Sequence, residues 1–196
     1  MTYFGEGAAS MGDFHGALNF AATLRAQTLF YCRNNMYAIS TPIDQQYAGD
    51  GIAIRGVAYG MSSIRVDGND LIAIYHATKK ARELILKEKR PVLIEAISYR
   101  VGDHSTSDFS ERYRDEEEMK KWKEHLSKFT SPIQRIEKYL TKRGLLTEER
   151  TASLRKEARD QVRHALKTAT KEQLPEVDQL FEQVYEEMPD ILKEQR

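Results

Sequence analysis

The sequence predicts an α/β domain with a mostly parallel sheet, followed by a charged helical region. Strand-like and helix-like stretches alternate along the first hundred residues, which is typical of an α/β domain. From about residue 115 onward the sequence is charged and helical, with no further strand pattern. We therefore expect an α/β domain over residues 1–114 and a helical region over residues 115–196. The helical region should pack on the core or on a partner subunit.

The composition excludes several classes of partner and site. Lys and Arg number 30, as do Asp and Glu, so no net positive field attracts nucleic acid or an acidic membrane. The single cysteine, Cys32, cannot form an internal disulfide, and no spacing resembles a zinc site. The chain is typical of an intracellular, reduced protein.

The expected elements follow from periodicity and from cap and turn residues. Strands are predicted at 2–4, 28–32, 63–66 and 92–97. Helices are predicted at 13–24, from Asp70 toward Pro91, from Pro132 to Gly144, at 147–168 and at 177–188. Residues 38–62 lack sustained periodicity and predict a long loop. The strand before Gly5 is a stub, so we expect the domain to be incomplete at its N-terminus.

The segment from Gly5-Glu6-Gly7 to Asn34-Asn35 predicts a metal and phosphate site. Two parallel strands would bring Glu6 and Asn35 to the same edge of the sheet, where ligands bind in open α/β folds. Carboxylate and amide oxygens suit magnesium, and the glycines let a phosphate approach the backbone. Separately, each motif is commonly a turn or a loop. A dinucleotide site is a poor competitor, because the glycines stand at 5, 7 and 12.

A second segment, from Tyr99 to Arg114, follows the last predicted strand and is dense in reactive groups. His104 would lie on the same sheet edge as the phosphate, where an imidazole can hydrogen-bond a phosphate or move a proton. The remaining histidines fall within helical stretches and are interpreted as surface residues; they stand at 15, 76, 125 and 164.

Together these motifs resemble a known family. Gly-Glu-Gly, a spacer over residues 8–33 and then Asn-Asn resemble the thiamine diphosphate motif, with Glu6 in place of its aspartate. Tyr-Arg-x-Gly-x-His-Ser-Thr-Ser-Asp, which starts at Tyr99, is similar to the alpha subunit of branched-chain 2-oxo acid dehydrogenases. The resemblance covers essentially the whole chain. It implies the C-terminal portion of that subunit and a thiamine-diphosphate-binding fold.

The resemblance implies a ligand set. Magnesium would be held by Glu6, Asn35 and the main-chain oxygen of Tyr37. Thiamine diphosphate would be contacted by Gly7, Ala8, Arg33 and His104. A potassium site is expected in an N-terminal part that this chain lacks.

The resemblance also implies a reaction and its regulation. The reaction is the oxidative decarboxylation of branched-chain 2-oxo acids such as 3-methyl-2-oxobutanoate, in branched-chain amino acid catabolism. His104 would act in acyl transfer to a lipoyl group, and Ser105 would be an inhibitory phosphorylation site. The active-site loop spans residues 98–114, and its ordering residues would be Arg100, Asp108, Tyr113 and Arg114.

The family further implies partners and a location. These are a beta subunit in an α2β2 heterotetramer, a lipoyl-bearing transacylase core, and a kinase and phosphatase if the protein is mitochondrial. The expected location is the mitochondrial matrix, or the cytoplasm in a bacterium. The chain departs from the family at Met11, Met36 and Asp115, where glutamate, glycine and serine are often found. A pyruvate or acetoin dehydrogenase and a non-catalytic interaction module remain as alternatives. Alone, the chain is expected to be inactive.

Overall fold

The computed structural model describes residues 1–126, 131–182 and 184–195. The chain divides into two compact units, Met1–Arg143 and Gly144–Arg196. The predicted α/β class is confirmed, because the first unit combines a parallel sheet with helices on both of its faces. Among the described residues, no helix has both the length and the apolar character needed to cross a bilayer.

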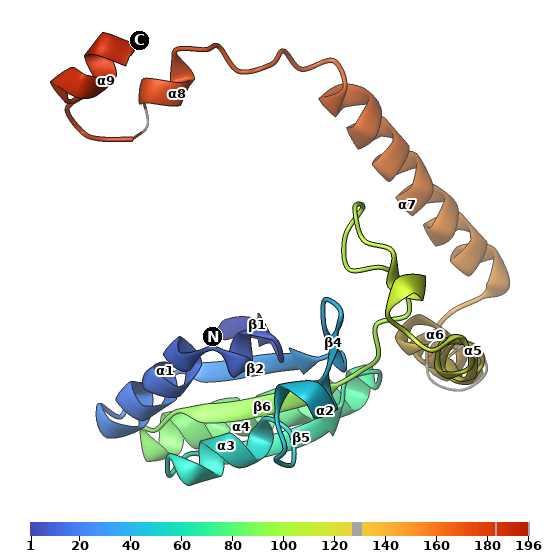
Figure 1. Cartoon of the computed structure of the whole chain (residues 1–196). Coiled ribbons are helices and arrows are strands. Elements are labelled where there is room, and N and C mark those ends of the chain that lie inside the picture. Colours follow the sequence, from blue (N-terminus) through green and yellow to red (C-terminus); the bar gives the residue numbers. More distant parts are fainter. Residues whose placement is uncertain (127–130, 183, 196) are drawn as a thin grey trace. The chain divides into compact units, whose positions relative to one another are not determined.

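Four parallel strands form the main sheet, in the order β1-β2-β6-β5 (Figure 1). Their bounds are Thr2–Gly5 for β1, Leu29–Asn34 for β2, Ser62–Asp67 for β5 and Val92–Ile97 for β6. The register aligns Gly5 with Arg33 and Asn34 with Ile97. The carboxyl ends of the strands therefore share one edge, and the residues after β1, β2 and β6 meet there.

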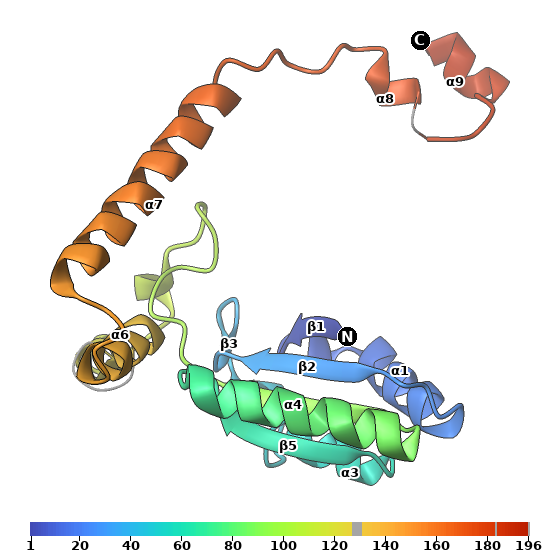
Figure 2. The ribbon, with the colours of Figure 1, turned by 180° about the vertical axis from the view of Figure 1, so that it is seen from behind.

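Helices cover both faces of this sheet, which explains why β6 is almost wholly apolar. On one face lie α1 (Gly12–Thr23) and α3 (Ala53–Ala58), and on the other lies α4 (Leu71–Glu88) (Figures 1 and 2). The first core contains Leu18, Cys32, Ile52 and Leu93 among its fully buried residues. The second contains Ala81, Ile85, Val92 and Ile94.

The predicted long loop over residues 38–62 is wrong, because the segment is largely structured. It contains part of the hairpin β3 (Tyr37–Ala38) and β4 (Thr41–Pro42), then α2 (Ile43–Gln46) and α3. These elements are too short to show periodicity. Gly56, one of the glycines that suggested a loop, packs within α3: a Cβ there would lie 2.3 Å from Ser63 Oγ.

The turn between β5 and α4 is fixed by two aspartates. Asp70 caps α4 as predicted, and its carboxylate accepts hydrogen bonds from the amides of Ile72 and Ala73 at 3.0 and 2.9 Å. Arg135 of α6 (Pro132–Lys142) donates to Asp67 at 2.7 Å and to Asp70 at 2.5 Å. These ion pairs attach α6 to the sheet layer.

The C-terminal prediction is only partly right. Helix α7 (Glu148–Ala169) begins after its cap, Thr147, as expected. The single helix predicted over residues 177–188 is wrong: the described residues form α8 (Gln179–Glu182), and α9 (Asp190–Gln195) follows Pro189. Most apolar side chains of this segment are exposed, Leu180 by 71%, so little packing supports a longer helix.

Candidate functional site

Glu6 and Asn35 meet at the carboxyl edge of the sheet. Glu6 follows β1 and is 1% exposed. Its Oε2 accepts a hydrogen bond of 3.0 Å from the backbone amide of Asn35, which follows the adjacent strand β2. A carboxylate this deeply buried needs a cation or several donors nearby. The contact joins the Glu6 carboxylate to the backbone of Asn35 at the ends of two adjacent strands.

The backbone after Asn35 turns sharply, and this turn orients Tyr37. The Asn35 side-chain oxygen accepts from the Tyr37 amide at 3.2 Å. Between them Met36 has a φ of 74°, in the left-handed region that favours glycine. Glycine is often found at this position in the family that the sequence resembles, and the backbone angle of Met36 gives the reason. Tyr37 is 7% exposed, and Arg100 Nη1 donates to its carbonyl oxygen at 3.3 Å.

The other predicted cofactor residues lie around this turn. Gly7 is close-packed, since a Cβ there would lie 2.8 Å from Ala38 Cβ. Ala8 is exposed and begins η1 (Ala8–Ser10). Arg33 is exposed on β2, in register with Gly5. The region therefore offers a close backbone approach at Gly7 and the exposed guanidinium of Arg33, which is on the strand next to the one that Glu6 follows.

The oxygen atoms of this region suit a hard cation. Asn35 and Tyr37 would contribute neutral oxygens, and Glu6 a charged one, which is the donor type that magnesium prefers. Within the described residues no three His, Cys, Asp or Glu side chains gather into a metal site. A cation here would therefore depend on amide and carbonyl oxygens beside one carboxylate.

A hydrogen-bonded chain joins the Tyr37 turn to the segment after β6. Arg100 Nη2 donates to Ile39 O at 2.6 Å and is 2.8 Å from the Tyr113 hydroxyl. Tyr113 donates to Asp108 Oδ2 at 2.6 Å. Hydrogen bonds from Tyr113 and from the His104 amide hold the pKa of Asp108 below its usual value. Arg114 Nη1 donates to Arg100 O at 2.5 Å. All four predicted ordering residues are thus connected by hydrogen bonds.

His104 and Ser105 lie in the exposed part of this loop. The His104 amide donates to Asp108 Oδ2 at 2.7 Å, so Asp108 fixes the backbone at His104. Ser105 Oγ is 3.3 Å from Ser107 Oγ. Both side chains are accessible from solvent. Hydrogen bonds join Glu6 to the Asn35 backbone amide and the Asn35 side chain to the Tyr37 amide. His104 is linked to Tyr37 through Asp108, Tyr113 and Arg100.

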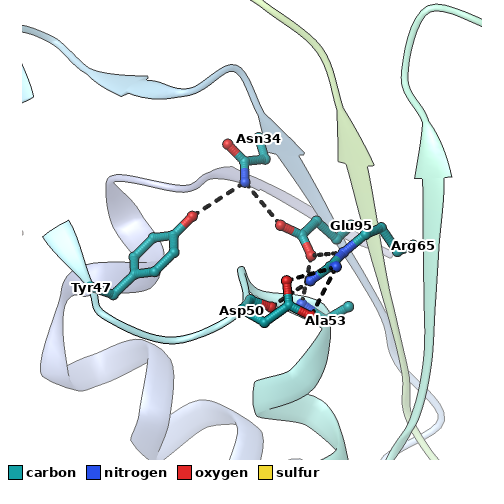
Figure 3. A network of polar contacts seen from close by, with 6 residues as sticks. All are labelled: Asn34, Tyr47, Asp50, Ala53, Arg65 and Glu95. Carbon is teal, nitrogen blue, oxygen red and sulfur yellow. Dashed lines mark hydrogen bonds and ion pairs between the residues drawn. The ribbon is translucent and has the colours of Figure 1, made fainter. Parts of the chain in front are cut away.

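A buried polar network beside this site was missed by sequence reasoning. Glu95, in the middle of β6, is fully buried and accepts hydrogen bonds from Asn34 Nδ2, Ala53 N and Arg65 Nε at 2.9, 2.8 and 3.0 Å (Figure 3). Arg65 also pairs with Asp50 at 3.0 Å. The available signal was a single carboxylate within an otherwise apolar strand.

This network keeps Glu95 charged. Burial raises the pKa of Glu95, but hydrogen bonds from Asn34, from the Ala53 and Ile52 amides and from Arg65 outweigh it, and the pKa lies below its usual value. A cavity of about 470 Å³ opens beside the network and is lined by Asn34, Met36, Tyr47 and Glu95, among others. The side chain of Asn34 therefore bonds Glu95 within the sheet, whereas the backbone amide of Asn35 bonds Glu6.

A second group that the sequence did not reveal surrounds the Tyr37 ring. The hydroxyls of Tyr37 and Tyr99 both donate to Glu118, in the first turn of α5 (Glu116–His125). Burial raises the pKa of each tyrosine to about 12, and the Glu118 carboxylate adds to the effect. The Arg114 guanidinium lies 4.6 Å from the centre of the Tyr37 ring.

Comparison with protein families decides the assignment. Residues 1–178 match the family model described as dehydrogenase E1 component. The chain belongs to this family. The match covers both the contact between Glu6 and Asn35 and the loop after β6.

Individual relatives are similar along the whole chain. The chain is 52% identical over 198 residues to the mitochondrial 2-oxoisovalerate dehydrogenase subunit alpha of Caenorhabditis elegans, covering 100% of this chain and 44% of the relative. Against the Homo sapiens protein of the same name it is 50% identical over 194 residues, covering 99% and 43%. Against subunit alpha 2 of Arabidopsis thaliana it is 45% identical, covering 100% and 40%. The chain thus spans less than half the length of these relatives.

Proposed function

We propose that this E1-family chain forms the magnesium and thiamine diphosphate half-site of a branched-chain 2-oxo acid dehydrogenase alpha subunit. The observation that carries the proposal is the contact between Glu6 and Asn35 at adjacent strand ends. Magnesium would be held by Glu6, the Asn35 side-chain oxygen and the Tyr37 carbonyl oxygen. The all-oxygen donor set supports this choice.

The cofactor would lie against the same strand ends. Gly7 and Ala8 would present backbone to the diphosphate, and Arg33 would counter its charge with a forked guanidinium. His104 would approach from the loop after β6. When bound, thiamine diphosphate supplies the carbon chemistry of decarboxylation, and the residues of this chain orient it and exclude water.

The substrate class follows from the relatives. Their name, 2-oxoisovalerate dehydrogenase, and identities of 45–52% along the chain favour branched-chain 2-oxo acids over pyruvate or acetoin. The complete enzyme would perform lipoamide-acylating oxidative decarboxylation, with His104 acting in acyl transfer. These relatives are named mitochondrial, so we place this chain in the mitochondrial matrix.

The loop over residues 98–114 would regulate this activity. Arg100, Asp108, Tyr113 and Arg114 would keep it ordered, which their hydrogen bonds support. Ser105 is exposed and would be phosphorylated by a kinase and restored by a phosphatase. A phosphate carries nearly two negative charges and would repel both the cofactor diphosphate and neighbouring aspartates.

The remaining parts of the assembly come from other chains. A beta subunit would complete the site in an α2β2 heterotetramer, and the transacylase core would deliver the lipoyl group. Residues 1–114 would then be the cofactor domain, and residues 115–196 a helical region packing on the core or a partner. The exposed apolar side chains near the C-terminus, such as Leu180 and Tyr185, support a packing role.

Reconstitution tests the proposal. The chain is mixed with a beta subunit, magnesium and thiamine diphosphate, and turnover is compared for 3-methyl-2-oxobutanoate and pyruvate with heat of cofactor binding as a second measurement. We expect saturable binding of thiamine diphosphate to the chain and, in a complete alpha subunit, faster turnover of 3-methyl-2-oxobutanoate than of pyruvate.

Faster turnover of pyruvate would favour a pyruvate dehydrogenase. No binding heat would favour a non-catalytic interaction module, and full turnover by the isolated chain would contradict its dependence on a partner.

A further inference from the structure

One carboxylate ties together the segments that follow the two central strands. Glu118 Oε2 accepts a 2.9 Å hydrogen bond from the Tyr37 hydroxyl, and its Oε1 accepts one of 3.2 Å from the Tyr99 hydroxyl. Tyr37 comes shortly after β2 and Tyr99 shortly after β6, and they are 7% and 6% exposed. Both oxygens of Glu118 are thus committed to phenols at the edge where the cation site is proposed.

Glu118 is itself held in a defined position. Its amide donates to the cap residue Asp115 at 2.8 Å, which fixes the first turn of α5. One turn later, Trp122 stacks on Tyr99 with ring centres 4.6 Å apart and an interplanar angle of 8°. The helix therefore contacts the tyrosine pair through both a carboxylate and an indole. This double contact fixes the direction from which Glu118 reaches Tyr37.

Tyr37 is restrained at every polar group it has. Its amide donates to Asn35, its carbonyl oxygen accepts from Arg100, and its hydroxyl donates to Glu118. The preceding residue, Met36, is in the left-handed region, which gives the turn little stability of its own. The hydrogen bond to Glu118 thus adds a side-chain restraint to the turn that carries the Tyr37 carbonyl and the Asn35 side chain.

We propose that Glu118 is a positioning residue for the cation site: by holding the Tyr37 hydroxyl it sets the Tyr37 carbonyl and the Asn35 side chain that would face magnesium. This inference rests on the proposed function, but the positioning of the 35–37 turn is a property of the chain without any ligand. Glu118 touches neither the cation nor the cofactor. Its hydrogen bonds go to Tyr37 and Tyr99, and it would act on the cation site through Tyr37.

The test compares three variants of the full 196-residue chain purified with a beta subunit. Glu118→Ala removes both acceptors, and Glu118→Gln keeps one acceptor oxygen of the same shape. Glu117→Ala is the matched control, because the Glu117 side chain is 83% exposed and pairs with Lys121 on the helix surface. Trp122 is the single tryptophan of this chain, so its fluorescence, recorded before the beta subunit is added, reports whether α5 stays docked.

Two measurements decide the outcome. The first is magnesium affinity by calorimetry at saturating thiamine diphosphate, where Glu118→Ala should weaken binding about tenfold, as outer partners of metal ligands do. The second is amide hydrogen exchange at Tyr37 without ligand, which should accelerate in Glu118→Ala, less in Glu118→Gln, and not in Glu117→Ala. The conservative variant guards against a failure of Glu118→Ala to fold.

Several results would overturn the proposal. If Glu118→Ala and Glu118→Gln lower thermal stability while magnesium affinity and Tyr37 exchange match the parent, Glu118 is merely structural. If the parent itself takes up no magnesium with thiamine diphosphate, the proposed function fails, and exchange alone decides the positioning role. Unchanged exchange at Tyr37 would then refute it.

Discussion

The backbone amide of Asn35 donates a 3.0 Å hydrogen bond to the carboxylate of Glu6, joining the ends of β1 and β2. Parallel strands make this contact possible, since neighbouring strands deliver their following residues to one edge. Glu6 is almost fully buried, so its charge is exposed to little water. A cation bound beside it would be attracted more strongly than at the protein surface.

Substitution of Glu6 tests its proposed role as the charged ligand. Glu6→Gln keeps the shape but removes the charge, and should weaken magnesium binding at least about tenfold, within the range for altered metal sites. Glu6→Asp keeps the charge on a shorter side chain, and its magnesium affinity should lie between those of the parent and Glu6→Gln. Calorimetry with magnesium and thiamine diphosphate measures the effect. Equal affinity in Glu6→Gln and the parent would remove Glu6 from the ligand set.

Met36 should carry backbone strain that glycine relieves. At an ordinary position glycine is less stable than alanine, but at a φ of 74° the order reverses. We expect the free energy of unfolding of Met36→Gly to exceed that of Met36→Ala by about 1 kcal/mol. The pair Ser40→Gly and Ser40→Ala is the control and should show the ordinary order. Urea denaturation measures all four, and a less stable Met36→Gly would contradict the strain.

Ser105 should act as a charge-sensitive switch of the loop. Ser105→Glu adds a negative charge near Asp108, whose amide donates to the Ser105 carbonyl at 3.2 Å. The loop should then lose order and become more sensitive to protease. Turnover of a complete complex should fall strongly. Ser105→Ala should keep both properties of the parent. Normal turnover of Ser105→Glu would refute this role of the loop.

Glu95 should make stability dependent on acid. The pKa of Glu95 in the folded chain lies below the ordinary value of 4.5. Its contribution to the free energy of unfolding is therefore present above pH 4.5 and is lost as the pH falls through the pKa of the folded state. Glu95→Gln should cost about 3 kcal/mol at neutral pH, because it removes the charge of a fully buried carboxylate that accepts hydrogen bonds from Asn34, Ala53 and Arg65. The difference from the parent should narrow in acid.

Thermal or urea unfolding between pH 7 and pH 3 measures this dependence on Glu95. Glu111→Gln, on an exposed residue, is the control and should track the parent throughout. A Glu95→Gln deficit that stays constant over the whole range would contradict the assignment of a lowered pKa.

The sequence was most informative where local chemistry decides the structure. Asp70 was predicted as a cap because aspartate accepts from the amides of a first helical turn, and it does. The convergence of Glu6 and Asn35 was predictable because a strand, a helix and a strand imply a parallel pair. The missing glycine at Met36 became meaningful only with the backbone angle.

Features that depend on distant partners were not predictable. The bonds from Asn34 and Arg65 to Glu95 come from the register of three strands, which no local pattern encodes. Glu118 meets Tyr37 across 81 residues of chain. The helix predicted over residues 177–188 was wrong because apolar periodicity alone does not stabilise a helix. Within the described residues most of its apolar side chains remain exposed.

The most direct measurement is a crystal structure of the chain with a beta subunit, magnesium and thiamine diphosphate. We predict one magnesium ion with oxygens of Glu6, Asn35 and Tyr37 at about 2.1 Å, the distance that octahedral magnesium demands. The diphosphate should complete its coordination. A cation bound elsewhere, or Glu6 and Asn35 contributing no ligand to it, would contradict the account.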